Sequence, residues 1–322
     1  MTDDLRGASE PAGRAAITAP PPALHGNHPS LSRQSGICLL LAITLLWGAN
    51  WPATKVAVSE IPVWTFRAIT LLGGGCGLLL CARIGGLSLL IRRVELAPTL
   101  LTTLFNVTAW QLLSAFGLIY MPSGRASILA LTMPLWAALL SVPLLGERLT
   151  FPLIISLFLG LIGLGAMMAP QAHEILLHPI GIVLMLAAAI SWALGTVLFK
   201  FFKWTSPTSV LVGWQLVLGG IPIMIGALIA DQSVDIGSIS GKAWLATAYT
   251  TFAAQIFCQW GWLKVAKQFP TAIAGLGIVA IPAVGVVSGA ILLGEKVGAD
   301  VFISLIATMA ALVVALVRPK SS

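Results

Sequence analysis

The sequence predicts an all-α polytopic membrane protein with ten transmembrane helices, arranged as two inverted-topology five-helix repeats. Three observations predict this fold class. Only 9% of the 322 residues are charged and the mean hydropathy is +0.97, whereas about 25% of the residues in a soluble domain are charged. The apolar residues gather in runs of about 20, the length that crosses a bilayer. Finally, the residues LLGE occur at Leu144–Glu147 and again at Leu292–Glu295.

The expected elements follow from these apolar runs, taken in order along the chain. We expect spans at residues 37–58, 62–82, 97–120, 124–145, 150–169, 178–200, 208–229, 242–264, 270–292 and 299–317. Residues 1–36 are rich in Pro, Ala, Gly and Ser and lack an apolar period, so we expect a disordered cytoplasmic tail and not a signal peptide. The spans then divide into a first repeat over 37–169 and a second over 178–318.

The positive charges favour an orientation with both termini in the cytoplasm. With the N-terminus inside, 13 of the 18 Lys and Arg residues fall in inner segments and four in outer segments, while Arg67 lies within a span. Lys and Arg concentrate on the cytoplasmic side of membrane proteins. The compact loops favour a bacterial inner (plasma) membrane.

Corresponding residues recur in the two halves at a nearly constant offset. Each half holds five spans in the same order, and five is odd, so the second copy would enter the membrane upside down. Inverted repeats of this kind build many secondary transporters, with the substrate site near the middle of the bilayer. The matched residues are Thr102, Thr103, Gln111, Pro122, Ala126 and Pro134 with Thr250, Thr251, Gln259, Pro270, Ala274 and Pro282, and Trp47 and Lys55 with Trp192 and Lys200.

Three features carry a resemblance to a known family. They are the stretch LLWGANWPATK in the first span, Arg67 in the second, and an Ala-rich helix with a central Pro that ends in LLGE, present twice. Over about residues 38–318 the chain resembles the EamA-type permeases of the drug/metabolite transporter superfamily. The resemblance implies a ten-helix, two-repeat fold and the movement, often outward, of amino acids or other small metabolites. The halves differ, however, since Ala193 and Gly195 stand where the first half has Gly48 and Asn50.

Polar and tryptophan side chains inside spans are the candidates for a substrate cavity. Amides within a bilayer face the bundle interior or a water-filled cavity, because an unpaired amide in lipid is costly. Tryptophan can wall a cavity and stack on an apolar or cationic substrate. The alternative for each is interhelical packing or hydrogen bonding. The candidates are Trp47, Asn50, Asn106, Trp110, Gln111, Ser127, Trp192, Thr196, Gln255, Gln259 and Trp260.

Three prolines within spans are candidates for gating or kinks. Pro52, Pro134 and Pro282 each remove one helical hydrogen bond and free the carbonyl four residues earlier. In lipid that carbonyl needs a partner from another helix, from water or from substrate. A packing kink is the alternative interpretation.

Charged residues at or near span ends are expected to be structural. Arg67 is expected to extend to the outer interface, with a substrate-carboxylate anchor as the alternative, and Lys55 and Lys200 are also expected to reach the interface. Glu147 and Glu295 follow their spans directly, and a role in a tight turn or in capping the next helix is expected.

Several classes of function have no support in the sequence. No Asp or Glu lies in the middle of a span, so direct proton coupling through a buried carboxylate is not expected. His173 and His178 in HEILLH are five apart and not the four that a zinc-binding helix face needs. No Walker A or GxSxG pattern occurs, and no metal or cofactor is expected. The net charge of +7 comes from scattered residues and gives no indication of nucleic acid.

The sequence therefore favours a transporter and not an enzyme. The hypothesis is a secondary transporter or facilitator that exports amino acids or related small metabolites by alternating access, as a monomer or homodimer in contact with membrane lipid. A permease for nucleotide sugars or hydrophobic amines is the alternative within transport. An integral-membrane enzyme or sensor is the alternative outside it, and would need a polar catalytic cluster or a soluble domain.

Overall fold

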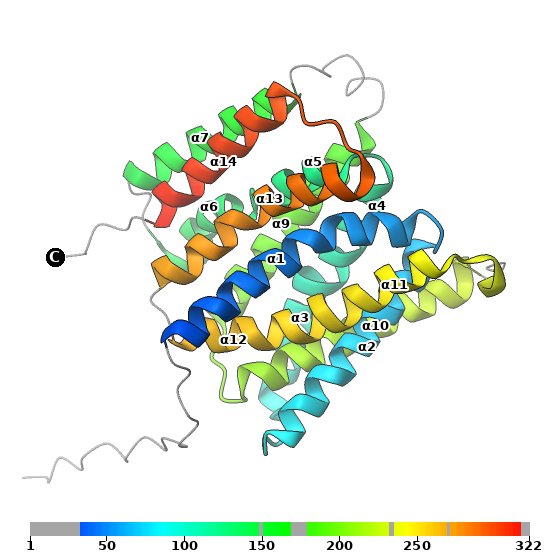
Figure 1. Ribbon diagram of the computed structural model, residues 1–322. Coiled ribbons are helices and arrows are strands. Elements are labelled where there is room, and N and C mark those ends of the chain that lie inside the picture. The colour runs from blue at the N-terminus through cyan, green and yellow to red at the C-terminus, as the bar shows by residue number, and fades with distance from the viewer. Residues whose placement is uncertain (1–32, 148–150, 169–178, 232–234, 269–270, 317–322) are drawn as a thin grey trace, which may run out of the picture.

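The computed structural model describes residues 33–147, 151–168, 179–231, 235–268 and 271–316 (Figure 1). In this part of the chain the regular secondary structure is helical throughout, without a strand. The first helix, α1, begins at Arg33, four residues before the expected span at residue 37. The rest of the expected tail and the His173–His178 pair lie outside the described residues.

The helices have the following bounds in chain order. They are α1 (Arg33–Val58), α2 (Val63–Ile84), α3 (Arg93–Thr103), the π-helix η1 (Leu104–Ala109), α4 (Trp110–Ile119), α5 (Ser123–Ala130), α6 (Met133–Leu145), α7 (Phe151–Met168), α9 (Ile180–Phe201), α10 (Thr208–Ala230), the short 3-10 helix η3 (Ile236–Ser238), α11 (Gly241–Tyr249), the π-helix η4 (Thr250–Cys258), α12 (Gln259–Gln268), α13 (Thr271–Leu293) and α14 (Ala299–Leu316).

Many of these helices are long and apolar enough to cross a membrane. Among the described residues, six segments meet this condition by length and composition: Gln34–Val58, Val63–Ile84, Arg93–Ile119, Ser123–Leu145, Ile180–Phe201 and Thr208–Ala230. Two shorter apolar helical segments are Val279–Leu293 and Ala299–Ala311. The chain is therefore a polytopic membrane protein, as the composition predicted.

Proline and glycine mark the ends of several helices. Pro62, Pro122 and Pro207 directly precede α2, α5 and α10 with φ of −52°, −60° and −58°. The proline ring fixes this angle and lacks the N–H that the first helical turn would leave unpaired. The glycines of the two LLGE stretches end α6 and α13, since Gly146 and Gly294 have φ of 69° and 66°. A left-handed residue at this position favours glycine, which has no Cβ.

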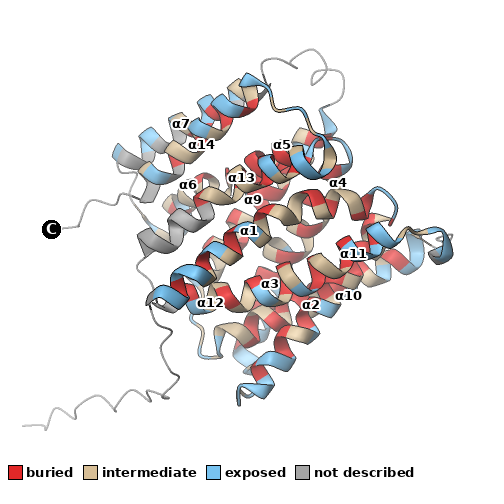
Figure 2. Cartoon of the chain, viewed as in Figure 1, coloured by how far each residue is buried: buried red, intermediate tan, exposed pale blue. Residues whose placement is uncertain are grey.

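The helices pack side by side in pairs that join distant parts of the sequence. α2 lies along α10, α7 along α14, and α1 along α13, while α9 contacts α4, α5 and α6 (Figure 1). Glycine allows the close approach of α2 and α10, because a Cβ on Gly75 would lie 2.7 Å from Val217 Cγ2. Buried residues cover the facing sides of the helices, and exposed residues cover the periphery (Figure 2). Many exposed side chains are large and apolar, including Leu41, Leu45 and Leu80, as expected for surfaces that contact lipid tails.

The two central prolines of the repeated helix have different local surroundings. Before Pro134 the chain leaves the helix at Leu131–Thr132, so α5 and α6 are separate helices. Pro282, in contrast, lies inside the continuous helix α13. Pro134 thus follows a break inside the apolar span Ser123–Leu145 and occupies the first turn of a new helix, where its missing N–H costs little.

Candidate functional site

Two π-helices lie where the two halves of the chain contact each other. η1 carries Asn106, and η4 carries Gln255, one turn before Gln259. Ser191 Oγ of α9 donates a hydrogen bond of 2.8 Å to the Phe105 carbonyl in η1. Short π-helical turns occur frequently at functional sites, because they insert an extra residue and redirect side chains and carbonyls. The sequence pattern did not signal these turns.

Small residues bring the opposite helices against the π-helices. A Cβ on Gly195 of α9 would lie 2.7 Å from the Asn106 backbone nitrogen, and a Cβ on Gly74 of α2 would lie 2.5 Å from Gln255 Cβ. Gly195 stands where the first half has Asn50, a difference visible in the sequence. The structure gives its reason: only glycine admits the backbone of η1 at this distance.

The two asparagines of the candidate set hold buried oxygens without hydrogen-bond partners. Asn50 Oδ1 on α1 and Asn106 Oδ1 on η1 are both buried and unpaired among the described residues. Leaving such an acceptor unpaired costs about 1–3 kcal/mol. A substrate or water that donates a hydrogen bond would remove this cost, so both amides are suited to line a polar site.

Several tryptophans lie on the helices that carry or directly follow these residues. The Trp51 and Trp110 rings meet edge to face with centroids 6.4 Å apart, joining α1 to α4. Trp47 donates from Nε1 to the Ala254 carbonyl of η4 at 3.2 Å. Trp260 carries the Lys264 ammonium 4.1 Å from its ring centroid. Trp51 was absent from the candidates, although it neighbours Asn50 in the WGANW stretch, a signal that could have identified it.

The remaining candidates differ in their burial and in their hydrogen bonds. Gln111 and Gln255 are buried, at 9% and 6% exposure. Gln259, Trp192 and Thr196 are half-buried, and the Thr196 hydroxyl donates to the Trp192 carbonyl of its own helix. The Ser127 hydroxyl donates to the Gly124 carbonyl at 2.7 Å, also within its helix. Thr196 and Ser127 are thus locally paired, whereas the asparagines are not.

Arg67 does not extend to a membrane interface, which corrects the expectation from the sequence. Its side chain on α2 is 4% exposed and turns toward α4. Nε donates to the Gln111 carbonyl at 2.9 Å and Nη2 to Ser114 Oγ at 3.4 Å. The Arg67 side chain can reach these acceptors on α4 because α2 and α4 are in contact. The position of Arg67 within its own helix does not show which helix lies beside it.

A network of polar contacts closes the end of the bundle where α1 and α13 end. Glu295, which follows α13, accepts hydrogen bonds from the backbone N–H groups of Ser123 (2.6 Å) and Gly124 (3.0 Å) at the start of α5. It therefore caps a helix of the other half and not the next helix, which corrects that expectation. Lys55 also differs from expectation, since Nζ donates to the carbonyls of Ile119 and Met121, each at 3.1 Å, at the end of α4.

These residues border a surface hollow. It has a volume of about 550 Å³ and is lined by Lys55, Val56, Ser59, Ile119, Tyr120, Met121, Pro122, Leu293 and Glu295. Nearby, Arg125 and Asp300 form an ion pair of 2.8 Å. The hollow lies at the ends of α1, α4 and α13.

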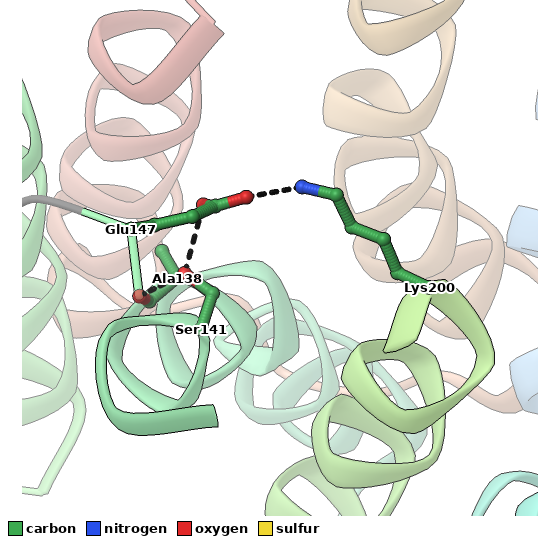
Figure 3. A network of polar contacts seen from close by, with 4 residues as sticks. All are labelled: Ala138, Ser141, Glu147 and Lys200. Atoms are coloured by element: carbon green, nitrogen blue, oxygen red, sulfur yellow. Dashed lines mark hydrogen bonds and ion pairs between the residues drawn. The ribbon is translucent and has the colours of Figure 1, made fainter. Parts of the chain in front are cut away.

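The other LLGE glutamate takes part in a related network at the opposite end of α9 (Figure 3). Glu147 forms an ion pair with Lys200, and its second oxygen accepts a hydrogen bond of 3.0 Å from Ser141 Oγ. The Ser141 hydroxyl also contacts the Ala138 carbonyl. The Lys200 side chain is 58% exposed, so this pair is worth about 1 kcal/mol or less.

The described residues do not assemble a metal site, since no group of three His, Cys, Asp or Glu residues occurs among them. The arrangement instead offers hydrogen-bond acceptors, aromatic walls and one buried guanidinium. Such a set can bind a small polar molecule.

Comparisons with known proteins identify the family of this chain. The model of the EamA-like transporter family matches residues 34–169 and again residues 179–317. The chain belongs to the EamA-like transporter family. Its members are membrane transporters and not enzymes, so a small-molecule substrate and contact with membrane lipid follow from membership.

Individual relatives of this EamA-like transporter support the same assignment. It is 32% identical over 232 residues to the uncharacterized transporter YvbV of Bacillus subtilis (strain 168), covering 70% of this chain and 72% of that protein. It is 27% identical over 294 residues to a probable amino-acid metabolite efflux pump of Escherichia coli (strain K12), covering 88% and 94%. A crystal structure with 20% identity and a TM-score of 0.63 covers 88% of this chain and 97% of that one, and shows a shared fold.

Proposed function

We propose that this EamA-like transporter exports amino acids or related small metabolites across a bacterial inner membrane by alternating access. The proposal includes ten transmembrane helices in two inverted five-helix repeats and both termini in the cytoplasm. Beyond the six clear spans, α7, the continuous run α11–η4–α12, α13 and α14 supply the other four crossings. The two separate family matches, 34–169 and 179–317, support a duplicated unit.

One pair of contacts carries the proposal of inverted halves. At the offset that pairs Trp47 with Trp192, 145 positions, Glu60 corresponds to Thr205 and Glu95 to Ser240. Glu60 accepts hydrogen bonds of 2.7 Å from the backbone N–H and the hydroxyl of Ser240 at the start of α11. Glu95 accepts from the Thr205 hydroxyl at 2.8 Å and from Ser206, just before α10. If each residue is replaced by its counterpart in the other half, the contact of Glu60 with Ser240 becomes the contact of Thr205 with Glu95.

The positions of these two contacts support inverted halves over parallel halves. Glu60 precedes α2 and Glu95 follows it, so the contacts lie at opposite ends of that helix. Parallel halves would place equivalent contacts at the same end. The packing of helices has the same symmetry. α2 packs against α10, its counterpart in the other half, and α7 packs against its counterpart α14. A transporter that opens to one side of the membrane at a time needs an equivalent contact that can close each end.

The substrate class rests on the chemistry at the centre and on one relative. Trp51, Trp110 and the unpaired amides of Asn50 and Asn106 suit a small molecule with hydrogen-bond donors and an apolar side. The E. coli relative is named a probable amino-acid metabolite efflux pump.

Flux from proteoliposomes tests the substrate. Purified protein should release a preloaded panel of radiolabelled amino acids faster than protein-free liposomes, measured with and without a pH gradient. Absence of faster release for every member of the panel would contradict the substrate class.

Cysteine labelling tests the orientation separately. In a variant with the four native cysteines replaced, Ser59→Cys should react with an impermeant maleimide in intact cells. Ser88→Cys, in the loop after α2, should react only after permeabilisation. Both side chains are exposed in the structure, so labelling of both from one side would contradict the proposed topology.

A further inference from the structure

Arg67 is a buried cation without a counter-ion. Its side chain is 4% exposed, and the two ion pairs recorded among the described residues, Arg125–Asp300 and Lys200–Glu147, do not involve it. A guanidinium is always charged in proteins, and transfer of an unpaired charge out of water is very costly. The transport mechanism proposed above does not by itself use this group.

The hydrogen bonds of Arg67 leave most of its donors unused. A guanidinium has five N–H donors. Among the described residues, one donates to the Gln111 carbonyl and one to Ser114 Oγ. Both acceptors are neutral, and the Phe66 ring lies 5.1 Å from the guanidinium carbon. These contacts hold the side chain in place, but they do not neutralise its charge.

Unpaired oxygens belong to the helices that surround this arginine. Thr54 on α1 and Thr250 at the start of η4 are 1% and 0% exposed, and their hydroxyls have no partner among the described residues. Asn50 Oδ1 is in the same condition and lies one turn from Thr54. Three buried acceptors without partners lie on α1 and η4, which both contact the helix α2 that carries Arg67 and its unused donors.

An apolar cluster joins helix segments that neighbour these groups in the sequence. Ala57 of α1, Phe66 of α2, Ala115 of α4 and Ala246 of α11 belong to a single buried cluster. Thr54 precedes Ala57 by three residues, and Thr250 follows Ala246 by four, so each lies about one turn from the cluster. Arg67 adjoins Phe66 directly.

A purely structural role explains the two hydrogen bonds but not the choice of residue. A neutral donor such as glutamine on α2 could hold the Gln111 carbonyl without the cost of burying a charge. A carboxylate that binds through two parallel hydrogen bonds uses the free edge of the guanidinium and neutralises it. The acceptor oxygens of Asn50, Thr54 and Thr250 would in turn suit an ammonium group.

We propose that Arg67 binds the carboxylate of the transported molecule, so that the protein selects α-amino acids and related carboxylates over amines and amides of the same shape. The unpaired acceptors on α1 and η4 receive the ammonium group. This inference rests on the proposed transport function and deepens it. Arg67 is therefore a specificity-determining residue of the central site.

A matched ligand series tests this inference without depending on flux. Purified wild-type protein is heated in detergent with leucine, leucinamide or isoamylamine, which share a side chain and differ at the carboxylate. The same series is repeated for phenylalanine, phenylalaninamide and phenethylamine. The inference predicts that only the amino acids raise the unfolding temperature, with an affinity at least tenfold above that of the amide. Equal stabilisation by acid and amide, or stabilisation by neither, would overturn it.

Variants then assign the discrimination to Arg67. Arg67→Gln should lose at least tenfold in affinity for the amino acid and little for the amide, and Arg67→Lys should recover part of the loss. Arg83→Gln, an exposed arginine at the other end of α2, is the matched control and should keep the wild-type preference. A folded Arg67→Gln protein that still prefers the acid tenfold would overturn the inference. If Arg67→Gln does not fold, Arg67→Lys and the wild-type series decide.

Liposome flux separates the inference from the proposed function. Export of amines and amides at the rate of amino acids would refute the role of Arg67 while transport itself stands. Selective binding of amino acids without any flux would refute transport while the carboxylate site stands.

Discussion

Removal of the Glu295 carboxylate should destabilise the protein, because this group joins its two halves. The change is Glu295→Ala. Glu295 accepts the backbone N–H groups of Ser123 and Gly124, the first two residues of α5, and both residues are buried. Each N–H that loses a charged partner while buried costs about 1–3 kcal/mol. The two together amount to about 2–6 kcal/mol of the free energy of unfolding.

A second substitution separates the contribution of the negative charge of Glu295 from that of its acceptor oxygens. Glu295→Gln keeps one carbonyl oxygen as an acceptor but loses the charge, which also interacts favourably with the helix N-terminus. We therefore expect a loss of about half that of Glu295→Ala. Lys296→Gln, at the exposed neighbouring position, is the control and should change stability by about 0.5 kcal/mol or less.

Thermal unfolding in detergent, followed by the fluorescence of the 11 tryptophans, measures these differences. The expected order of unfolding temperature is wild type and Lys296→Gln, then Glu295→Gln, then Glu295→Ala. At about 2–4 °C per kcal/mol for a chain of this size class, the alanine variant should unfold on the order of 5 °C or more below the wild type. Equal unfolding temperatures for all four proteins would show that the cap does not stabilise the fold.

Three further changes have expected outcomes. Gly289→Leu should reduce folded yield, since even a Cβ there would lie 2.5 Å from Glu295 Oε2; normal yield would refute the close packing. Gly195→Val should lower the unfolding temperature by several degrees, because its Cβ would meet the Asn106 backbone at 2.7 Å; an unchanged temperature would argue against this crossing. The hydrogen bonds from Ser240 lower the pKa of Glu60 below its ordinary value of 4.5; the resulting stability is present above that pH and lost as pH falls through the folded pKa. Glu60→Gln should remove this acid-dependent loss in a pH series of unfolding temperatures.

The local sequence pattern predicted the helices because helix formation in lipid depends on residues that are close together in the sequence. Apolar runs of sufficient length must satisfy their backbone polar groups internally when they lie in lipid, and only a helix does this within one segment. Proline before α5 and glycine after α13 set their ends through backbone angles that depend on a few neighbouring residues. The sequence placed Pro134 inside one span, and the structure divides that span into α5 and α6 at Leu131–Thr132.

The sequence offered candidate residues for the site but not the contacts that they make. Asn50, Asn106 and Trp110 were identifiable as polar or aromatic residues in apolar surroundings, where such residues are costly without a use. The orientation of Arg67 was not identifiable, because a long flexible side chain can turn outward to an interface or inward to a neighbouring helix. The choice depends on which acceptors the neighbour offers, here the Gln111 carbonyl.

The sequence by itself determined that this chain is a helical membrane protein with an internal duplication, since hydrophobicity, residue periods and matching positions are properties of the chain alone. Tertiary structure alone decided which helices meet and which polar groups are paired. Glu295 could cap any nearby helix start, and only the packing of α13 against α5 selects Ser123 and Gly124. The physical reason is range: backbone preferences act over a few residues, whereas hydrogen bonds and packing join residues 171 or more positions apart.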